Sequence, residues 1–196
     1  MADAAQPSTP RKPRADAERN RARLVAAAKD VFAEKRSAAS LDEIARVAGV
    51  GIGTLYRHFP TRDALIEAVY RSETDQLAGA ATRLSLTLTP VEALREWLLL
   101  FVDYLDTKHG MAEVLNSVVG GAPALYAATG FRASDAVAML AEKAAASGTI
   151  RLGLDPLDLL RAIAGVANLG TTGDWKPAGR RMVDILIAGL RAETAP

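Results

Sequence analysis

The side chains best suited to chemistry lie together in the segment IGTLYRH, residues 52–58. Thr54 and Tyr56 carry hydroxyls, Arg57 carries a guanidinium, and His58 carries an imidazole. Such groups donate hydrogen bonds to phosphate oxygens and to the edges of bases. Because a short helix cannot turn all of them inward, the segment is expected to present a polar face to a nucleic acid.

Other chemistries lack the residues that they need. There is no cysteine, and the two histidines, His58 and His109, are 51 positions apart, so no metal site is expected. No nucleophile motif surrounds any serine. The stretch GTTGDW, residues 170–175, lacks the preceding strand and the following Gly-Lys-Ser/Thr of a phosphate-binding loop. We therefore expect neither an enzyme nor a cofactor.

Helical patterns surround the 52–58 segment and must position it. An amphipathic helix is predicted from Asp16, because apolar residues recur at helical spacing: Leu24, Ala27, Ala28, Val31 and Phe32. Ser40, with Glu43 three residues later, reads as a capping box that opens a second helix. Pro60 closes the third helix, and Thr61 can cap a fourth.

The second and third helices are joined as in a helix-turn-helix. Gly49 can adopt the left-handed backbone of a sharp turn, and Ala45 is small where the two helices must cross. Four apolar residues are expected to pack this unit against the first helix: Ile44, Val50, Leu55 and Phe59. The geometry is that of a DNA-binding unit whose second helix enters the major groove.

The segment LDEIARVAGVGIGTLYRHFPTRDALIEAV, residues 41–69, resembles the N-terminal domain of the TetR family of bacterial transcriptional regulators. The similarity extends over roughly residues 18–75 at unbroken spacing. The resemblance implies a small set of phosphate-binding residues: Ser40, Thr54, Tyr56, His58 and Arg62. Base reading would then fall to Ile52, Gly53, Arg57 and also Tyr56, since arginine suits guanine and an apolar side chain suits a thymine methyl.

Several of these assignments have alternatives. Ile52 lies near Leu55 on the helix, so burial competes with base contact. His58 could instead pack between helices. Gly51 stands where the family usually has serine, which removes a hydroxyl cap and a candidate phosphate contact.

Charge and composition suggest the domain limits. Residues 1–62 hold 12 Lys or Arg against 7 Asp or Glu, whereas residues 63–196 hold 12 against 16. The positive surplus at the N-terminal end favours a polyanionic partner. We expect a disordered basic arm at 1–15, a DNA-binding domain at 16–77, and an effector-binding and dimerisation domain at 78–196, after the mixed stretch AGAATRLSLTLTP.

Two C-terminal segments, LDLLRAIAGVANL and RRMVDILIAGL, are apolar around most of their circumference. Each therefore needs two partners, which the resemblance identifies as the chain's own core and a second subunit in a four-helix bundle. Two core helices in a monomer are the alternative. The expected dimer contacts are Leu160, Ile163, Ala167, Met182, Ile185, Leu186 and Gly189.

Aromatic and sulfur-containing residues gather between these helices and the DNA-binding unit, where the resemblance implies an effector cavity. The expected lining is Trp97, Phe101, Tyr104, Met111, Leu115, Tyr126 and Phe131. Asp103, His109 and Asn116 are candidate polar anchors, although ordinary core packing is the alternative for each residue.

The sequence thus predicts an all-α fold and a homodimeric regulator that binds a double-stranded DNA operator. We expect a repressor released by a small-molecule effector; the alternative is a regulator that recruits a protein partner and binds no effector. The longest apolar run, residues 97–102, is far below the roughly 20 residues of a membrane span. A cytoplasmic location without membrane contact is expected.

Overall fold

The computed structural model describes residues 13–118, 121, 132–169 and 175–191 of the 196-residue chain. The described residues form helices and contain no strand beyond an isolated bridge between Ile150 and Arg191. The helices are α1 Pro13–Lys35, the 3-10 helix η1 Arg36–Ala38, α2 Leu41–Val47, α3 Ile52–His58, α4 Arg62–Thr87, α5 Pro90–Gly110, α6 Ala112–Ser117, α8 Arg132–Ala146, α9 Pro156–Leu169 and α10 Lys176–Leu190.

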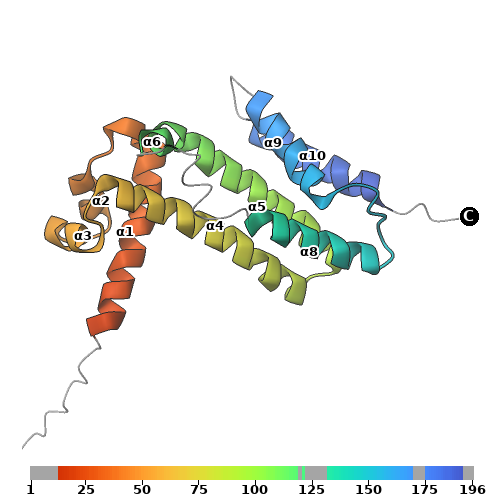
Figure 1. Ribbon diagram of the computed structural model, residues 1–196, viewed down its shortest axis with the longest axis horizontal. Coiled ribbons are helices and arrows are strands. Elements are labelled where there is room, and N and C mark those ends of the chain that lie inside the picture. The colour runs from red at the N-terminus through yellow and green to blue at the C-terminus, as the bar shows by residue number, and fades with distance from the viewer. Residues whose placement is uncertain (1–12, 119–120, 122–131, 170–174, 192–196) are drawn as a thin grey trace, which may run out of the picture.

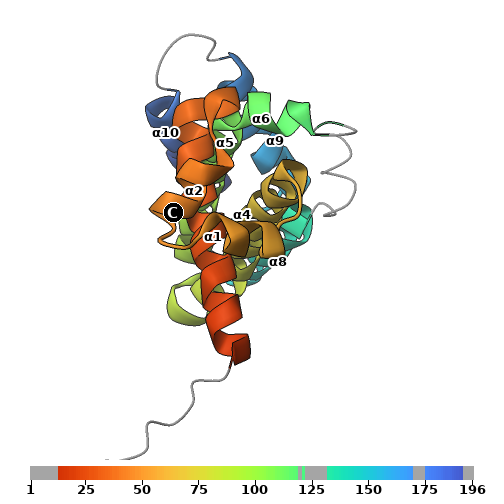
Figure 2. The same ribbon diagram turned by 90° about the vertical axis from the view of Figure 1, so that its left-hand side faces the viewer.

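The molecule is elongated, with a small head at one end and a larger body at the other (Figure 1). The head contains α1, α2, α3 and the first half of α4, and the body contains the rest of α4 with α5, α8, α9 and α10. Seen from the head end, α1 stands in front of the body (Figure 2). The fold is all-α, with an N-terminal helix-turn-helix followed by a helical domain, as predicted.

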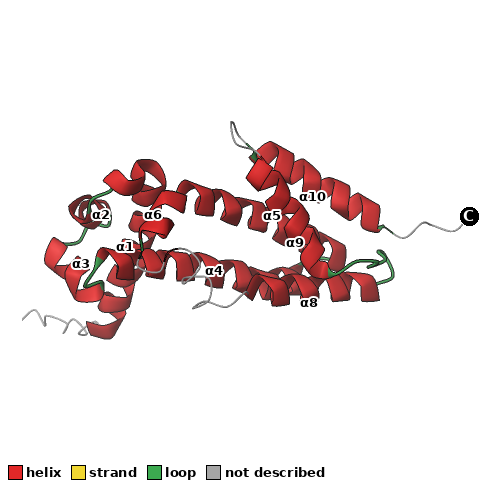
Figure 3. Cartoon of the chain, turned by 45° about the horizontal axis from the view of Figure 1, so that its top comes forward, coloured by secondary structure: helices red, strands yellow, loops and turns green. Residues whose placement is uncertain are grey.

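Helix α4 runs from the head into the body without interruption (Figure 3). The boundary expected between residues 77 and 78 lies inside this helix, and the mixed stretch AGAATRLSLT forms its last turns. Leu77, Ala80 and Ala81 are buried there, and the small side chains of the two alanines let α5 approach closely. The change in amino-acid composition at this stretch therefore coincides with the part of α4 that packs in the body, and not with a break between two helices.

The predicted helix signals are largely confirmed. The hydroxyl oxygen of Ser40 accepts a hydrogen bond from the Glu43 backbone N–H at 3.2 Å, and that of Thr61 accepts one from Ala64 at 3.1 Å. Only half of the first capping box forms, because the Glu43 carboxylate pairs with Lys35 at 2.5 Å instead. Helix α1 begins at Pro13 rather than at Asp16, since proline suits the first helical position.

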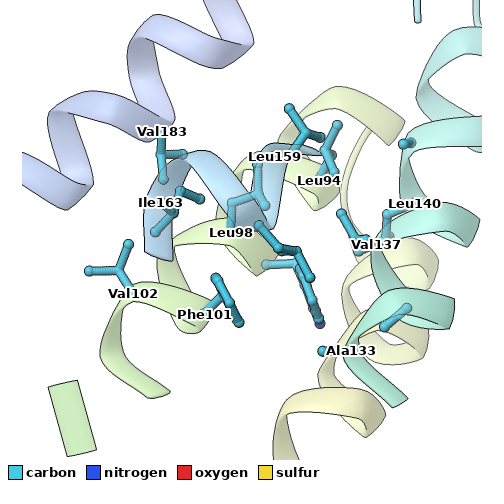
Figure 4. Packing of buried hydrophobic residues seen from close by; sticks show 14 of the residues in the cluster. Leu94, Leu98, Phe101, Val102, Ala133, Val137, Leu140, Leu159, Ile163 and Val183 are labelled. Atoms are coloured by element: carbon cyan, nitrogen blue, oxygen red, sulfur yellow. The ribbon is translucent and has the colours of Figure 1, made fainter. Parts of the chain in front are cut away.

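Two hydrophobic cores hold the two parts. The body core contains Trp97, Leu98, Val137, Ile163 and Val183 among its buried members, contributed by α5, α8, α9 and α10 (Figure 4). The head core is built from α1 to α4 and also takes in α6. Along the described part of the chain, no helix is long and apolar enough to cross a membrane.

Candidate nucleic-acid interface

The turn between α2 and α3 is formed by Gly49, whose φ is +65°. An added Cβ would lie 2.5 Å from Nη2 of Arg23, which donates a hydrogen bond to the Gly49 carbonyl oxygen at 3.4 Å. The predicted role of Gly49 is thus confirmed. Arg23, which belongs to α1, therefore also holds this turn in place.

The first helix contributes a second arginine that sequence reasoning missed. The guanidinium of Arg21 lies 5.2 Å from the centre of the Phe59 ring, at the residue that ends α3. Together Arg21 and Arg23 hold both ends of the turn-α3 unit against α1. Their position beside the apolar stripe of α1 is the signal that could have identified them, since long cationic side chains often cover the edge of such a stripe.

Helix α3 has one buried face and one face open to solvent. Leu55 and Phe59 are buried, with exposed fractions of 0% and 2%, as predicted. Gly53, Tyr56 and Arg57 are exposed. These three residues therefore form the part of α3 that is available to the edges of bases.

Thr54 and His58 are half-buried, on the borders of the exposed face. The imidazole of His58 lies 6.3 Å from the Phe59 ring, centre to centre. Such border positions suit contacts with the phosphates that flank a groove. Thr54 and His58 could make such contacts from the positions that they already occupy on α3.

Ile52 is half-buried and packs against the head core. The apolar side chain at the first turn of α3 thus has an internal partner, which is the burial alternative left open above. Base contact by Ile52 stays a prediction. Gly51, which precedes it, has extended backbone with φ −71° and no atom within 4 Å of an added Cβ.

Ser40 is exposed at the start of α2. Its oxygen already accepts the Glu43 N–H, but a hydroxyl carries one donor as well as acceptor positions. The O–H of Ser40 can therefore donate to a phosphate oxygen while the cap stays in place.

Arg62 has a structural role that the sequence did not reveal. Its guanidinium donates to the Ala39 carbonyl and, at 3.4 Å each, to the carbonyls of Arg36 and Ser37. It ties the start of α4 to the segment that leads into α2. Its predicted phosphate contact stays a prediction, and any phosphate would share this side chain with three carbonyl oxygens.

The structure places the residues that were expected to line the effector cavity in two different hydrophobic cores. Trp97 and Phe101 are stacked in the body core with ring centres 6.1 Å apart, and Trp97 donates from Nε1 to the Leu77 carbonyl at 2.9 Å. Met111 and Leu115 belong to the head core instead, because α6 packs beside η1. Both are buried there, and their place in an effector pocket stays a prediction.

Tyr104, another member of that expected set, borders a hollow of about 210 Å³ among α1, α4 and α5. Its hydroxyl lies 3.3 Å from that of Tyr70. Tyr126 and Phe131 lie outside the described residues. Ordinary packing, the alternative left open above, describes the surroundings of Trp97 and Phe101, and an effector role for the set stays a prediction.

The residues that were expected at the dimer interface also differ in their exposure to solvent. Leu160, Ile163 and Ala167 are buried in the core of the same chain, at 2%, 0% and 5% exposure, which leaves little of their surface for a second subunit. Ile185 is 63% exposed, and Gly189 is exposed beside it. The remaining two expected contacts, Met182 and Leu186, are half-buried. The expected set drew on whole apolar helices and did not separate the face that meets the chain's own core from the face that is open to solvent.

Comparisons with known proteins agree with this geometry. Residues 24–69 match the model of the bacterial regulatory proteins of the tetR family, and residues 89–192 match that of the SbtR-like transcriptional regulator C-terminal domain. An HTH-type transcriptional regulator of Staphylococcus aureus is 30% identical over 110 residues, and SrpR of Pseudomonas putida is 40% identical over 101. These matches span 58% and 44% of the two relatives.

Solved structures extend the similarity over most of the chain. A TetR transcriptional regulator from Streptomyces coelicolor is 41% identical, with a TM-score of 0.80, covering 89% of this chain and 99% of that one. A TetR regulatory protein from Mycobacterium vanbaalenii is 32% identical, with a TM-score of 0.70, covering 91% and 99%. The chain therefore belongs to the TetR family of bacterial transcriptional regulators.

Proposed function

We propose that this protein is a homodimeric repressor that binds an operator through α3 and releases it when a small molecule binds. The observation that carries the proposal is the exposed face of α3, where Tyr56 is 50% exposed and Arg57 is open to solvent. Monomeric DNA contact through one short helix is weak, and two helices about 34 Å apart can address successive major grooves.

The outer faces of α9 and α10 support dimerisation. Leu169 is 84% exposed and Ile185 is 63% exposed, although both are large and apolar. An added Cβ on Gly165 or Gly189 would meet no atom within 4 Å, so both glycines leave room for another helix to approach. The residues proposed to meet the second subunit share these faces: Ala162, Gly165, Val166, Leu169, Met182, Ile185, Leu186 and Gly189.

Light scattering after size exclusion tests the dimer. Ile185→Asp places a charge in the proposed interface and should give a monomer of about half the native mass, because an unpaired charge is costly to bury. Lys143→Asp, on an exposed residue of α8, a helix that takes no part in the proposed interface, is the matched control. A dimer that persists in Ile185→Asp at micromolar concentration contradicts this interface.

Mobility shifts on the DNA that flanks the gene test the repressor itself. Specific, salt-sensitive binding supports the proposal, because neutralised phosphates release counterions. Absence of any preferred fragment refutes it. A regulator that recruits a protein partner would bind DNA in the same way but would show no release by any small molecule.

A further inference from the structure

Helix α5 connects the head to α10. It packs along α4, which enters the head, and its last residue, Gly110, lies against α1, where an added Cβ would be 3.8 Å from Cβ of Ala33. In the body, α5 contacts α10 (Figure 3). Because α10 carries Ile185 on the face proposed to meet the second subunit, the angle between α5 and α10 decides where the head lies relative to that subunit.

Helix α10 comes close to α5 at Gly179. An added Cβ on this glycine would lie 3.3 Å from Cγ1 of Val102, a buried residue of α5. Val183 and Ile187, on the next turns of α10, are buried as well. Apolar burial is not directional, so these contacts hold the two helices together while other groups are needed to select one angle between them.

Ion pairs lie on both sides of the contact at Gly179. On one side, Nη2 of Arg95 lies 2.7 Å from Oδ1 of Asp184, and Nε of the same arginine donates to that oxygen at 2.8 Å. On the other side, Nη2 of Arg180 lies 3.1 Å from each carboxylate oxygen of Asp103. A change in the angle between α5 and α10 would move the charged groups of these pairs apart.

Lys176 extends the second of these pairs into a network. Its Nζ lies 3.1 Å from Oδ1 of Asp103 and 3.2 Å from Oδ2 of Asp106. The hydrogen bond with Asp103 raises the pKa of Lys176 above its ordinary value, so the cation stays charged at neutral pH. A network of charges can hold one arrangement where an isolated surface pair contributes little.

The order of the charges along α10 favours a single alignment with α5. Lys176 and Arg180 are positive, and Asp184, one turn later, is negative. A slip of one turn that moved Asp184 to the place of Arg180 would set its carboxylate beside that of Asp103, where like charges repel. The pattern therefore disfavours the slipped alignment in addition to stabilising the observed one.

We infer that Arg95 and Asp103, through their partners on α10, are positioning residues for DNA binding that set the spacing of the two heads. The inference rests on the proposed function, because it needs a dimer formed through α9 and α10. Both residues belong to α5 in the body, so they act on the placement of α3 and not on DNA itself. Exposed ion pairs are individually weak, so the network favours one spacing without excluding a second, which an effector could then select.

A charge exchange tests the role in DNA binding. Asp184→Arg reverses one partner of Arg95 and should weaken operator binding about fivefold, the upper range for one exposed ion pair. Because this change adds positive charge, a fall in DNA affinity cannot come from net charge. Arg95→Glu combined with Asp184→Arg restores opposite charges and should recover most of the affinity; failure to recover it would overturn the inference.

The matched control for that exchange is Arg161→Gln. It breaks an exposed ion pair of similar length, 2.7 Å to Asp158, that lies within α9 and joins no two helices. Its operator affinity should equal that of the native protein. A loss as large as that of Asp184→Arg would show that any broken surface pair has this effect and would contradict a special role for the pairs between α5 and α10.

Spin labels measure the spacing of the heads directly. The sequence has no cysteine, so Glu34→Cys, at an exposed position of α1, gives each subunit one labelling site. Double electron–electron resonance should give one narrow head-to-head distance with native ion pairs, a shifted or broader one in Asp184→Arg, and the native one again in the charge exchange. An unchanged distance in Asp184→Arg would overturn the inference, because a purely stabilising pair would lower the Tm and leave the spacing as it was.

A second variant removes the dependence on α10. Asp103→Asn takes the partner from Lys176 and Arg180 without altering α10, and it should also broaden the distance and weaken operator binding. Native distance and affinity in this variant contradict the inference even if Asp184→Arg no longer dimerises.

Light scattering and mobility shifts on the native protein separate the inference from the proposed function. A dimer with specific DNA binding that none of the ion-pair variants alters refutes the inference alone. Head distances that depend on the ion pairs, without any preferred DNA fragment, refute the proposed function alone. A monomeric native protein refutes both.

Discussion

The guanidinium of Arg62 lies 5.0 Å from the centre of the Phe32 ring, beneath the loop that leads into the helix-turn-helix. Phe32 is fully buried in the head core, so Arg62 joins the first turn of α4 to the end of α1. The same side chain donates to the Ala39 carbonyl just before the cap of α2. One arginine thus links the three helices on which the position of α3 depends.

Arg62→Ala should therefore lower the stability of the head as well as DNA affinity. Loss of charged hydrogen bonds to carbonyls costs about 2 kcal/mol. Thermal unfolding should show a lower Tm, and Arg62→Lys, which retains the charge but not the planar fork, should recover only part of it. An unchanged Tm combined with weaker DNA binding would instead assign Arg62 to phosphate contact alone.

Gly51→Ser should stabilise α3 and raise the affinity of the protein for DNA. The position is an extended N-cap with open space around an added Cβ, so a serine hydroxyl can accept an α3 backbone N–H. A gain of a few tenths of a kcal/mol in stability and a higher affinity for all DNA sequences are expected.

The matched variant for that position is Gly51→Ala, which adds the Cβ without the hydroxyl. It should lower stability, because alanine is a poor N-cap. Parallel denaturant titrations and binding curves compare the two variants. Equal behaviour of the serine and alanine variants would show that the hydroxyl does nothing.

Gly49→Ala should weaken DNA binding, whereas Gly148→Ala should not. Both glycines have positive φ, +65° and +74°, so alanine costs each about 1 kcal/mol or more in the left-handed region. Only Gly49 has Arg23 beside it, and displacing that side chain releases the turn. Equal DNA affinities of the two variants, measured at matched folded fractions, would argue against the arginine clamp.

Acidic pH should destabilise the N-terminus of α5, because it protonates the Glu92 carboxylate. The backbone N–H and hydroxyl of Thr89 donate to its carboxylate at 3.1 and 2.7 Å, and they lower the pKa of Glu92 below its ordinary value of 4.5. A lowered folded-state pKa gives stability that is present above 4.5 and lost as the pH falls through the folded pKa. The difference in Tm between native protein and Glu92→Gln should therefore shrink below pH 4.5; a constant difference would contradict this.

Sequence patterns predicted the parts of this molecule that depend on local chemistry. Ser40, Gly49 and Thr61 act at helix ends, where neighbouring residues decide the outcome. Leu55 and Phe59 were predicted correctly because helical spacing fixes which face is buried. The helix-turn-helix could therefore be predicted almost entirely.

Features that depend on distant residues could not be predicted in this way. Whether Met111 packs in the body or in the head depends on where α6 lies, and Ile163 faces inward because α5 and α10 contact it. Arg62 reaches carbonyls more than 20 positions earlier in the chain. No local spacing shows such contacts.

The most direct test of the account is the affinity of Arg57→Ala for its operator and for a scrambled fragment of equal length. Arg57 is exposed on α3, so its loss should cost about 1–3 kcal/mol on the operator and far less on scrambled DNA. Arg151→Ala, which removes a positive charge from the body, controls for net charge. A large loss confined to the operator is the predicted result; equal losses on both fragments, or none, would contradict the claim that α3 reads the sequence.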